Sequence, residues 1–166
     1  MSTSNSQANI LVADYQNPSH GEAILALLDQ YAQDPMGGGT PISEKVRNQL
    51  IGKLAQNATA VSFLAELDGE YVGLANCFLG FSTFACEELI NIHDFAVSPS
   101  ARGKGIGKQL MRAVEQYARE RGCCKVTLEV LEGNHVAKAL YQKCGFAGYA
   151  LDPEAGHALF WDKKLT

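Results

Sequence analysis

The chain has 166 residues, of which 46% are hydrophobic and 19% charged, and its formal net charge is −4. This length and composition are typical of one globular domain and exclude a disordered chain. There is no run of about 18 apolar residues, which a membrane-spanning helix needs. The acidic balance argues against general nucleic-acid binding and is compatible with a cationic small-molecule partner. We expect a flexible tail at residues 1–8 and a single domain over residues 9–166.

The first residues and the cysteines indicate the compartment. The stretch from Met1 to Gln7 lacks the basic and apolar parts of a signal peptide, so a cytoplasmic protein is expected. The five cysteines include no Cys-x-x-Cys pair and no His/Cys cluster with zinc spacing, and their odd number does not suit a disulfide framework. We therefore expect reduced, mostly buried thiols and no metal site.

The N-terminal part predicts one strand and two helices. Residues 10–15 have the composition of a short strand. Pro18 opens a helix with apolar residues at helical spacing, and this helix ends near Asp34. Ser43 is placed to cap a second helix that runs to about Gln56.

A glycine-rich segment separates these two helices. Residues 35–41 contain three glycines and two prolines, which favour neither a helix nor a strand. The segment is therefore predicted to be a loop. It is either a flexible connector or a recognition loop that lines a binding site and moves on binding, and the sequence favours neither role.

From residue 60 the apolar period changes to two, which predicts an antiparallel meander of three strands. The strands are expected at residues 60–67, 71–84 and 87–97, with a tight turn at Asp68-Gly69 between the first two.

The third strand of this meander contains an irregularity. Ile90 and Ile92 share one face, but after Asp94 the large apolar residues are Phe95 and Val97, so the alternation slips by one residue. A β-bulge produces such a slip, and bulges re-aim side chains beside active sites. We place the bulge at His93-Asp94; the alternative is a strand buried on both faces.

A glycine cluster follows this strand and precedes an amphipathic helix that begins near Ile106 and stops at Gly122. Glycines let main-chain amides approach an anion, and a helix N-terminus adds positive potential, so the turn suits a phosphate. A dinucleotide fingerprint would need Gly at Lys108, and a Walker A loop would need Gly at Arg102, so neither matches. The alternative is a glycine-rich turn with surface bases. The candidate anion-binding residues are Arg102, Gly103, Lys104, Gly105, Ile106, Gly107 and Lys108.

The C-terminal part predicts one more strand and helix, followed by two short strands. Residues 125–131 form a strand that is parallel to the preceding one if the intervening helix makes the usual crossover. Asn134 caps a helix that Gly145 closes. Short strands are expected around residues 147–151 and 157–164.

The glycine turn and the last helix together carry a family resemblance. The turn has the form Arg-x-x-Gly-x-Gly, and the helix has the form Asn-x-x-Ala-x-x-x-Tyr-x-x-x-Gly-Phe. These two motifs, in this order on a strand-helix-strand-helix scaffold, resemble GNAT-type N-acetyltransferases, which use acetyl-coenzyme A (acetyl-CoA). The resemblance covers roughly residues 90–146. The matching helix residues are Asn134, Ala137, Tyr141, Gly145 and Phe146.

The resemblance implies the GNAT fold, an α/β (α+β) architecture with a mixed, mostly antiparallel sheet of six to seven strands, a splayed central parallel pair and about four helices. It implies acetyl-CoA as co-substrate and no metal. Backbone groups freed at the bulge would bind the pantetheine arm and thioester carbonyl, and the glycine-turn amides would hold the pyrophosphate. The residues implied for coenzyme binding, besides those of the turn, are Phe95, Ala96, Val97, Asn134, Ala137 and Tyr141.

Acetyl transfer to an amine needs a base for the ammonium, donors for the carbonyl oxygen and a proton for the departing thiolate. By resemblance Tyr141 supplies that proton; the alternative is a core tyrosine, since it also lies on the apolar stripe of its helix. The base is left open. His93 could titrate near neutrality and Asp94 could hold the cationic amine, while Glu66 or Glu129 could reach in from neighbouring strands. The alternative for His93 is a hydrogen-bonded strand histidine.

The expected function is transfer of an acetyl group to a primary amine of a small molecule by direct attack in a ternary complex. Residues 92–97 are similar to diamine acetyltransferases, but His93 stands where those have an acidic residue, and a dication would lose part of its counter-charge. Other hypotheses are a non-catalytic acyl-CoA sensor or interaction module, and a protein or peptide N-acetyltransferase. A covalent route through Cys144 lacks a base partner. We expect no nucleic-acid or membrane partner, and the family suggests a homodimer.

Overall fold

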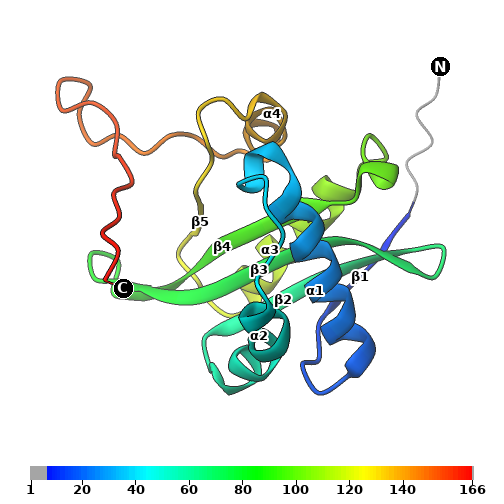
Figure 1. Ribbon diagram of the computed structural model, residues 1–166. Coiled ribbons are helices and arrows are strands. Elements are labelled where there is room, and N and C mark those ends of the chain that lie inside the picture. The colour runs from blue at the N-terminus through cyan, green and yellow to red at the C-terminus, as the bar shows by residue number, and fades with distance from the viewer. Residues whose placement is uncertain (1–6, 166) are drawn as a thin grey trace.

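The structure, a computed structural model, describes residues 7–165 and is built on one five-stranded sheet with helices on both faces (Figure 1). The strands are β1 (Asn9–Val12), β2 (Ala60–Leu67), β3 (Glu70–Ser82), β4 (Glu87–Val97) and β5 (Val126–Leu128). The α-helices are α1 (Pro18–Gln33), α2 (Glu44–Gln56), α3 (Ile106–Glu120) and α4 (His135–Lys143), and the 3₁₀ turns are η1 (Pro35–Gly37) and η2 (Pro99–Ala101). The strands lie in sequence order, antiparallel from β1 to β4, and β5 is parallel to β4. The predicted α/β (α+β) class is confirmed.

The predicted helix starts are confirmed by their caps. The Asn17 side chain accepts a hydrogen bond from the Ser19 N–H at the start of α1. The Ser43 hydroxyl accepts one from the Val46 N–H at 3.3 Å at the start of α2. Both side chains satisfy amides that have no partner inside the helix, so local sequence chemistry fixes where these helices begin. No helix among residues 7–165 has the length and apolar character needed to cross a bilayer.

The glycine-rich segment between α1 and α2 has a defined shape. The Asp34 carboxylate accepts a hydrogen bond from the Met36 N–H at 2.9 Å, and the Asp34 carbonyl accepts one from the Gly37 N–H at 2.8 Å. A Cβ at Gly37 would collide with the carbonyl oxygen of Tyr31. Glycine is therefore required at this position because the segment folds back onto the end of α1.

The predicted bulge in β4 is confirmed. Asp94 pairs with Asn76 of β3, and the next pair joins Ile92 to Cys77, so His93 is the extra residue. The bulge inverts the side-chain alternation, which keeps apolar residues on the same face before and after it. Strand β4 therefore presents a carboxylate to one face and an unbroken apolar row to the other.

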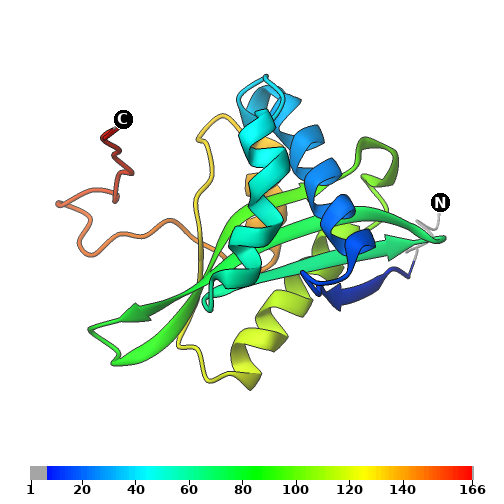
Figure 2. The ribbon, with the colours of Figure 1, turned by 60° about the horizontal axis from the view of Figure 1, so that its bottom comes forward.

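The sheet separates two cores, and Figure 2 shows α1 on one face of the sheet and α3 on the other. On one face α1 covers the sheet, and Ile24 packs with Leu64 and Leu74. On the other face α3 contributes Leu110 and Val114 to a larger core that also contains residues of α4. Each face is thus occupied by its own set of helices.

The parallel pair is splayed, as predicted. Strand β5 pairs with β4 only between residues 126–128 and 90–92. Strand β4 continues for five residues beyond Ile92, as far as Val97, while β5 diverges from it (Figure 1). The backbone of β4 after Ile92 is therefore free on its β5 side.

The predicted sheet of six to seven strands is too large, because the described chain forms five. Residues 147–151 and 157–164 are not strands; their one link is an isolated bridge between Ala150 and His157. Their large apolar side chains are exposed, including Trp161 at 83%. Strand-like alternation needs a neighbouring strand to become structure, and this segment extends away from the sheet (Figure 2).

The N-terminal end of the described chain is packed. Ala8 is buried, and its N–H donates a hydrogen bond to the Gln109 side chain of α3 at 3.0 Å. Most of the expected tail, residues 1–6, lies outside the described residues.

Candidate active site

The glycine turn opens α3 in a form that leaves main-chain donors available. Gly103 and Gly105 have left-handed conformations, with φ of 76° and 80°. Gly105 is the N-cap of α3, and no described side chain caps the helix there. A Cβ built at Gly103 meets nothing within 4 Å, so the turn is open on that side. An uncapped helix N-terminus with an open approach fits a diphosphate.

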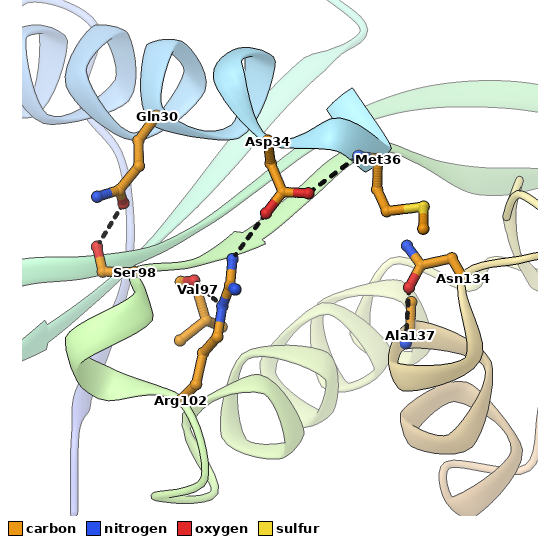
Figure 3. A network of polar contacts seen from close by, with 8 residues as sticks. All are labelled: Gln30, Asp34, Met36, Val97, Ser98, Arg102, Asn134 and Ala137. Carbon is orange, nitrogen blue, oxygen red and sulfur yellow. Dashed lines mark hydrogen bonds and ion pairs between the residues drawn. The ribbon is translucent and has the colours of Figure 1, made fainter. Parts of the chain in front are cut away.

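Arg102 makes contacts that the sequence did not predict. Its Nε donates a hydrogen bond to the Val97 carbonyl at 3.1 Å, and its Nη2 lies 3.4 Å from the Asp34 carboxylate (Figure 3). The side chain thus joins the glycine turn to the end of β4 and the end of α1. Lys104 and Lys108 are exposed. The positive charge that the turn offers to an anion comes mainly from these lysines and the helix end.

Two further residues of the turn serve packing. Ile106 is 1% exposed and lies in the core, so it can offer a ligand only its N–H. A Cβ at Gly107 would lie 3.0 Å from Leu140 and 3.7 Å from Phe95. Gly107 therefore allows α3, α4 and β4 to approach closely.

Tyr141 lies beside the free part of β4. It is 8% exposed, and its ring packs on Phe95 of β4 at 5.9 Å and on Phe146 at 6.1 Å between centroids. Burial, with a smaller contribution from Tyr31, raises the pKa of Tyr141 to about 12. The phenol therefore keeps its proton at neutral pH and can donate a hydrogen bond.

Asn134 caps α4, as predicted from the sequence. Asn134 Oδ1 accepts a hydrogen bond from the Ala137 N–H at 3.1 Å (Figure 3). The cap engages the oxygen of the side-chain amide, and the Nδ2 group remains as a donor for a ligand. Ala137 packs partly against the larger core.

The bulge places His93 and Asp94 differently. His93 is exposed; its Nδ1 lies 3.0 Å from the Asn91 side-chain oxygen, and its ring meets Phe78 edge-on at 5.2 Å. Asp94 is partly exposed, and its Oδ2 accepts a hydrogen bond from Asn76 Nδ2 at 3.0 Å. Asp94 is thus held from within the sheet, and Ala96 and Val97 follow it on the free stretch of β4.

The other carboxylates considered from the sequence lie elsewhere. Glu66 is near the β1 edge, where it accepts a hydrogen bond from Asn9 at 3.4 Å. Ser62, not Glu66, is level with the bulge on β2. Glu129 is exposed just past the end of β5. The structure therefore does not bring Glu66 to the candidate site.

Tyr31 is a further candidate site residue that the sequence did not reveal. Burial raises its pKa, and the negative charges of Asp94 and Asp34 add to the effect. Tyr31 in turn contributes to the raised pKa of Tyr141. The Tyr31 phenol is therefore within electrostatic reach of both candidate catalytic groups. Its position on the apolar stripe of α1 gave no sign of this role.

The geometry therefore combines an uncapped glycine turn, a splayed strand pair and a buried tyrosine beside it. The chain matches the acetyltransferase (GNAT) family model over residues 22–146. It belongs to this family. Streptothricin acetyltransferase of Streptomyces lavendulae is 36% identical over 118 residues, which are 66% of this chain and 60% of that protein. An uncharacterized N-acetyltransferase of Bacillus subtilis (strain 168) is 32% identical over 91 residues, which are 55% of this chain and 61% of that protein.

Solved structures of the GNAT family show the same fold. The aminoglycoside N-acetyltransferase AAC(6')-Iy in complex with CoA superposes with a TM-score of 0.71, at 21% identity, over 96% of each chain. A probable acetyltransferase superposes with a TM-score of 0.76, at 21% identity, over 94% of this chain and 99% of that one. The sequence matches span about three fifths of the length of the two curated relatives above.

Proposed function

We propose that this GNAT-family chain transfers the acetyl group of acetyl-CoA to a primary amine of a small molecule, by direct attack in a ternary complex. The observation that carries the proposal is the arrangement around the end of β4. Strand β5 leaves β4 after Ile92, and Tyr141, a buried phenol with a pKa of about 12, packs beside the freed stretch. The glycine turn lies at the far end of that stretch.

Three sets of residues in this chain would each bind a different part of the coenzyme. The main-chain groups of residues 95–97 would hold the pantetheine arm and the thioester, because β5 does not cover them. The amides of residues 103–108 would hold the diphosphate at the start of α3. Asn134 Nδ2 would donate a further hydrogen bond, since the other end of that amide caps α4.

The acceptor would bind on the face that α1 covers. Asp94 is a partly exposed carboxylate at the bulge, and it would pair with the ammonium form of the amine. A proton must leave the ammonium before attack, and His93 or a water beside it is the proposed base. The amine nitrogen then forms a bond to the thioester carbon, the carbon–sulfur bond breaks, and the nitrogen loses its second proton, which the released thiolate takes up.

Tyr141 would donate to the departing sulfur. A thiol has an ordinary pKa of about 8.5, well below the value near 12 of this phenol. Full transfer of the proton is uphill, so Tyr141 acts as a hydrogen-bond donor that stabilises the developing thiolate. Covalent catalysis through Cys144 is disfavoured, because burial and Glu115 raise the pKa of Cys144 and so oppose its thiolate form.

The test is a screen of amines by thiol release from acetyl-CoA. The panel would contain aminoglycosides, streptothricin, amino acids, diamines and peptides, because relatives and neighbours bear the names of streptothricin and aminoglycoside acetyltransferases. We expect turnover with at least one small amine. Turnover on peptides alone would support a peptide acetyltransferase instead. Tight acetyl-CoA binding without turnover on any acceptor would support a sensor.

We extend the proposal to the domain bounds, the cellular compartment and the oligomeric state. We propose one domain over residues 9–166, acting in the cytosol, with a homodimer as the form to test by light scattering. The five cysteines are all free thiols, which fits a reducing compartment.

A further inference from the structure

A row of polar side chains crosses the sheet on the face that α1 covers. Ser62 pairs with Asn76, and Asn76 pairs with Asp94, so the three lie side by side on β2, β3 and β4. Tyr15 extends the row just beyond β1. Ser62 is 1% exposed and Asn76 is 3% exposed. Burying polar groups in a sheet costs free energy unless every group is hydrogen-bonded, so this row needs a reason.

The hydrogen bonds of the row all run in one direction. Asn76 Nδ2 lies 3.0 Å from Asp94 Oδ2, and because a carboxylate only accepts, the amide nitrogen must donate to it. That orientation aims Asn76 Oδ1 at Ser62 Oγ, 2.7 Å away, so the Ser62 hydroxyl donates its proton there. Ser62 has no second proton. Tyr15, whose Oη lies 2.9 Å from Ser62 Oγ, is therefore the donor in that pair.

The far end of the row is suited to remain a donor. Burial raises the pKa of Tyr15, so its phenol keeps its proton. Successive hydrogen bonds that point the same way polarise one another, and here they all point toward a negative charge. The row thus supplies donors to Asp94 Oδ2 and no acceptor for a proton from it.

We propose that Asn76 is a positioning residue for the acceptor amine: backed by Ser62 and Tyr15, it fixes one oxygen of the Asp94 carboxylate, so that the other oxygen faces the ammonium group. This inference rests on the proposed function in assigning the amine to Asp94. The bulge makes such a brace necessary, because the extra residue His93 interrupts the pairing of β3 and β4 beside Asp94. Within residues 7–165 Asp94 Oδ1 makes no hydrogen bond, and the side chain is partly exposed.

The first test is steady-state kinetics of Asn76→Ala with the best amine from the screen. A hydrogen bond to a charged group contributes about 1.5 to 3 kcal/mol, so we expect the amine KM to rise about tenfold to a hundredfold. The acetyl-CoA KM should not change. The matched control is Cys77→Ala, since Cys77 is the neighbouring residue, is 1% exposed and lies in the core on the other face. It should lower stability and leave the amine KM unchanged.

A double-mutant cycle separates positioning from general damage to the sheet. Asp94→Asn alone should raise the amine KM, and Asn76→Ala should add little in the Asp94→Asn background, because the charge to be positioned is gone. Equal effects of Asn76→Ala in both backgrounds would overturn the proposal. Ser62→Ala keeps the Asn76 side-chain amide but frees it to rotate. This variant should raise the amine KM by a smaller factor than Asn76→Ala does.

The last readout does not depend on activity. In a crystal structure of Asn76→Ala, or of Ser62→Ala if the first variant does not fold, we expect the Asp94 carboxylate to rotate from its orientation in the unmodified protein. An unchanged orientation would overturn the role of the row even if the enzyme is active. A further outcome is that Asp94→Asn leaves the amine KM unchanged while Asn76→Ala rotates the carboxylate. In that case the assignment of the amine to Asp94 fails, but the positioning of the Asp94 carboxylate by Asn76 is supported.

Discussion

The two faces of the sheet differ in the kind of atoms that make their sites. On the α3 face the candidate coenzyme site consists largely of main chain, with amides of residues 103–108 and the uncovered end of β4. On the α1 face the candidate acceptor site consists of side chains from separate elements, with Tyr31 from α1, Asn76 from β3 and Asp94 from β4. Tyr31 interacts electrostatically with both Asp94 and Tyr141 and so links the two candidate sites.

This difference explains how one scaffold can keep its coenzyme while its acceptor changes. Main-chain donors depend on the fold and on a few glycines, so most substitutions on the α1 face leave them intact. On the α1 face, by contrast, each substitution replaces a group that would itself contact the acceptor or position a contacting group. Variants should therefore separate into those that alter acetyl-CoA binding and those that alter only the amine KM.

The largest effect is expected for Gly105→Asp. A carboxylate at the N-cap of α3 would occupy the amides meant for the diphosphate and repel it, so acetyl-CoA binding should be lost in calorimetry. Gly105→Asn is the matched control, because asparagine has the same shape, tolerates the left-handed backbone and carries no charge. If both variants bind acetyl-CoA as the unmodified protein does, the turn is not the diphosphate site.

Tyr141→Phe should lower kcat by about tenfold to a hundredfold or more, with little change in acetyl-CoA affinity. The folded-state pKa of Tyr141, about 12, lies above the ordinary value of 10, so the phenol stays protonated throughout the usual assay range. The deficit should therefore be constant from about pH 6 to pH 10 in kcat profiles. An unchanged kcat, with chemistry shown to be rate-limiting, would leave Tyr141 a core residue.

Gly107→Ala should have a smaller effect, and it should disturb the sites of both substrates. The added methyl group meets Leu140 at 3.0 Å, and Leu140 directly precedes Tyr141, so α4 must shift slightly. Alanine favours the helix by about 1 kcal/mol, which offsets part of the crowding cost. We expect a few-fold loss in kcat and near-normal thermal stability. Adding Leu140→Val should restore activity. If activity does not recover, the loss does not come from the contact with Leu140.

The smallest effect is expected for Arg102→Ala. Its guanidinium, 54% exposed, is engaged with Val97 and Asp34, and such pairs contribute about 1 kcal/mol or less. Acetyl-CoA affinity should therefore change by less than about fivefold. Lys104→Ala is the comparison, and its effect should be larger at low salt and should fade as salt is added. A tenfold or greater loss for Arg102→Ala would mean that the side chain turns to the coenzyme.

The local elements of the candidate coenzyme site could be predicted from the sequence because their signals lie close together in the chain. The glycine turn, the Asn134 cap and the bulge at His93-Asp94 each depend on residues close together in the chain, and the structure has the cap and the bulge where they were predicted. The family match over residues 22–146 confirms the resemblance that these motifs carried.

Asp94 was predicted as part of the candidate acceptor site, but the residues that surround it were not, because they are distant in sequence. Ser62 and Asn76 look like ordinary strand residues until the register places them beside Asp94. Tyr31 fits the apolar stripe of α1 and gives no local sign of its electrostatic role. The expected strands after residue 146 failed for a related reason, since alternation alone cannot supply the neighbour that a strand needs.

The bulge in β4 has one more consequence, for protein engineering. Removing His93 would restore regular pairing with β3, and because Ile92 already pairs with Cys77 and Asp94 with Asn76, every later side chain of the strand would keep its face. The loss would fall on the backbone, because the extra residue bends the strand and leaves its own main-chain groups outside the ladder with β3, and a regular strand would lack both features. A single-codon deletion of His93 should therefore keep Asp94 beside Asn76 but straighten the strand next to the candidate site, so libraries for new acceptors should vary residue identity around the bulge and preserve strand length.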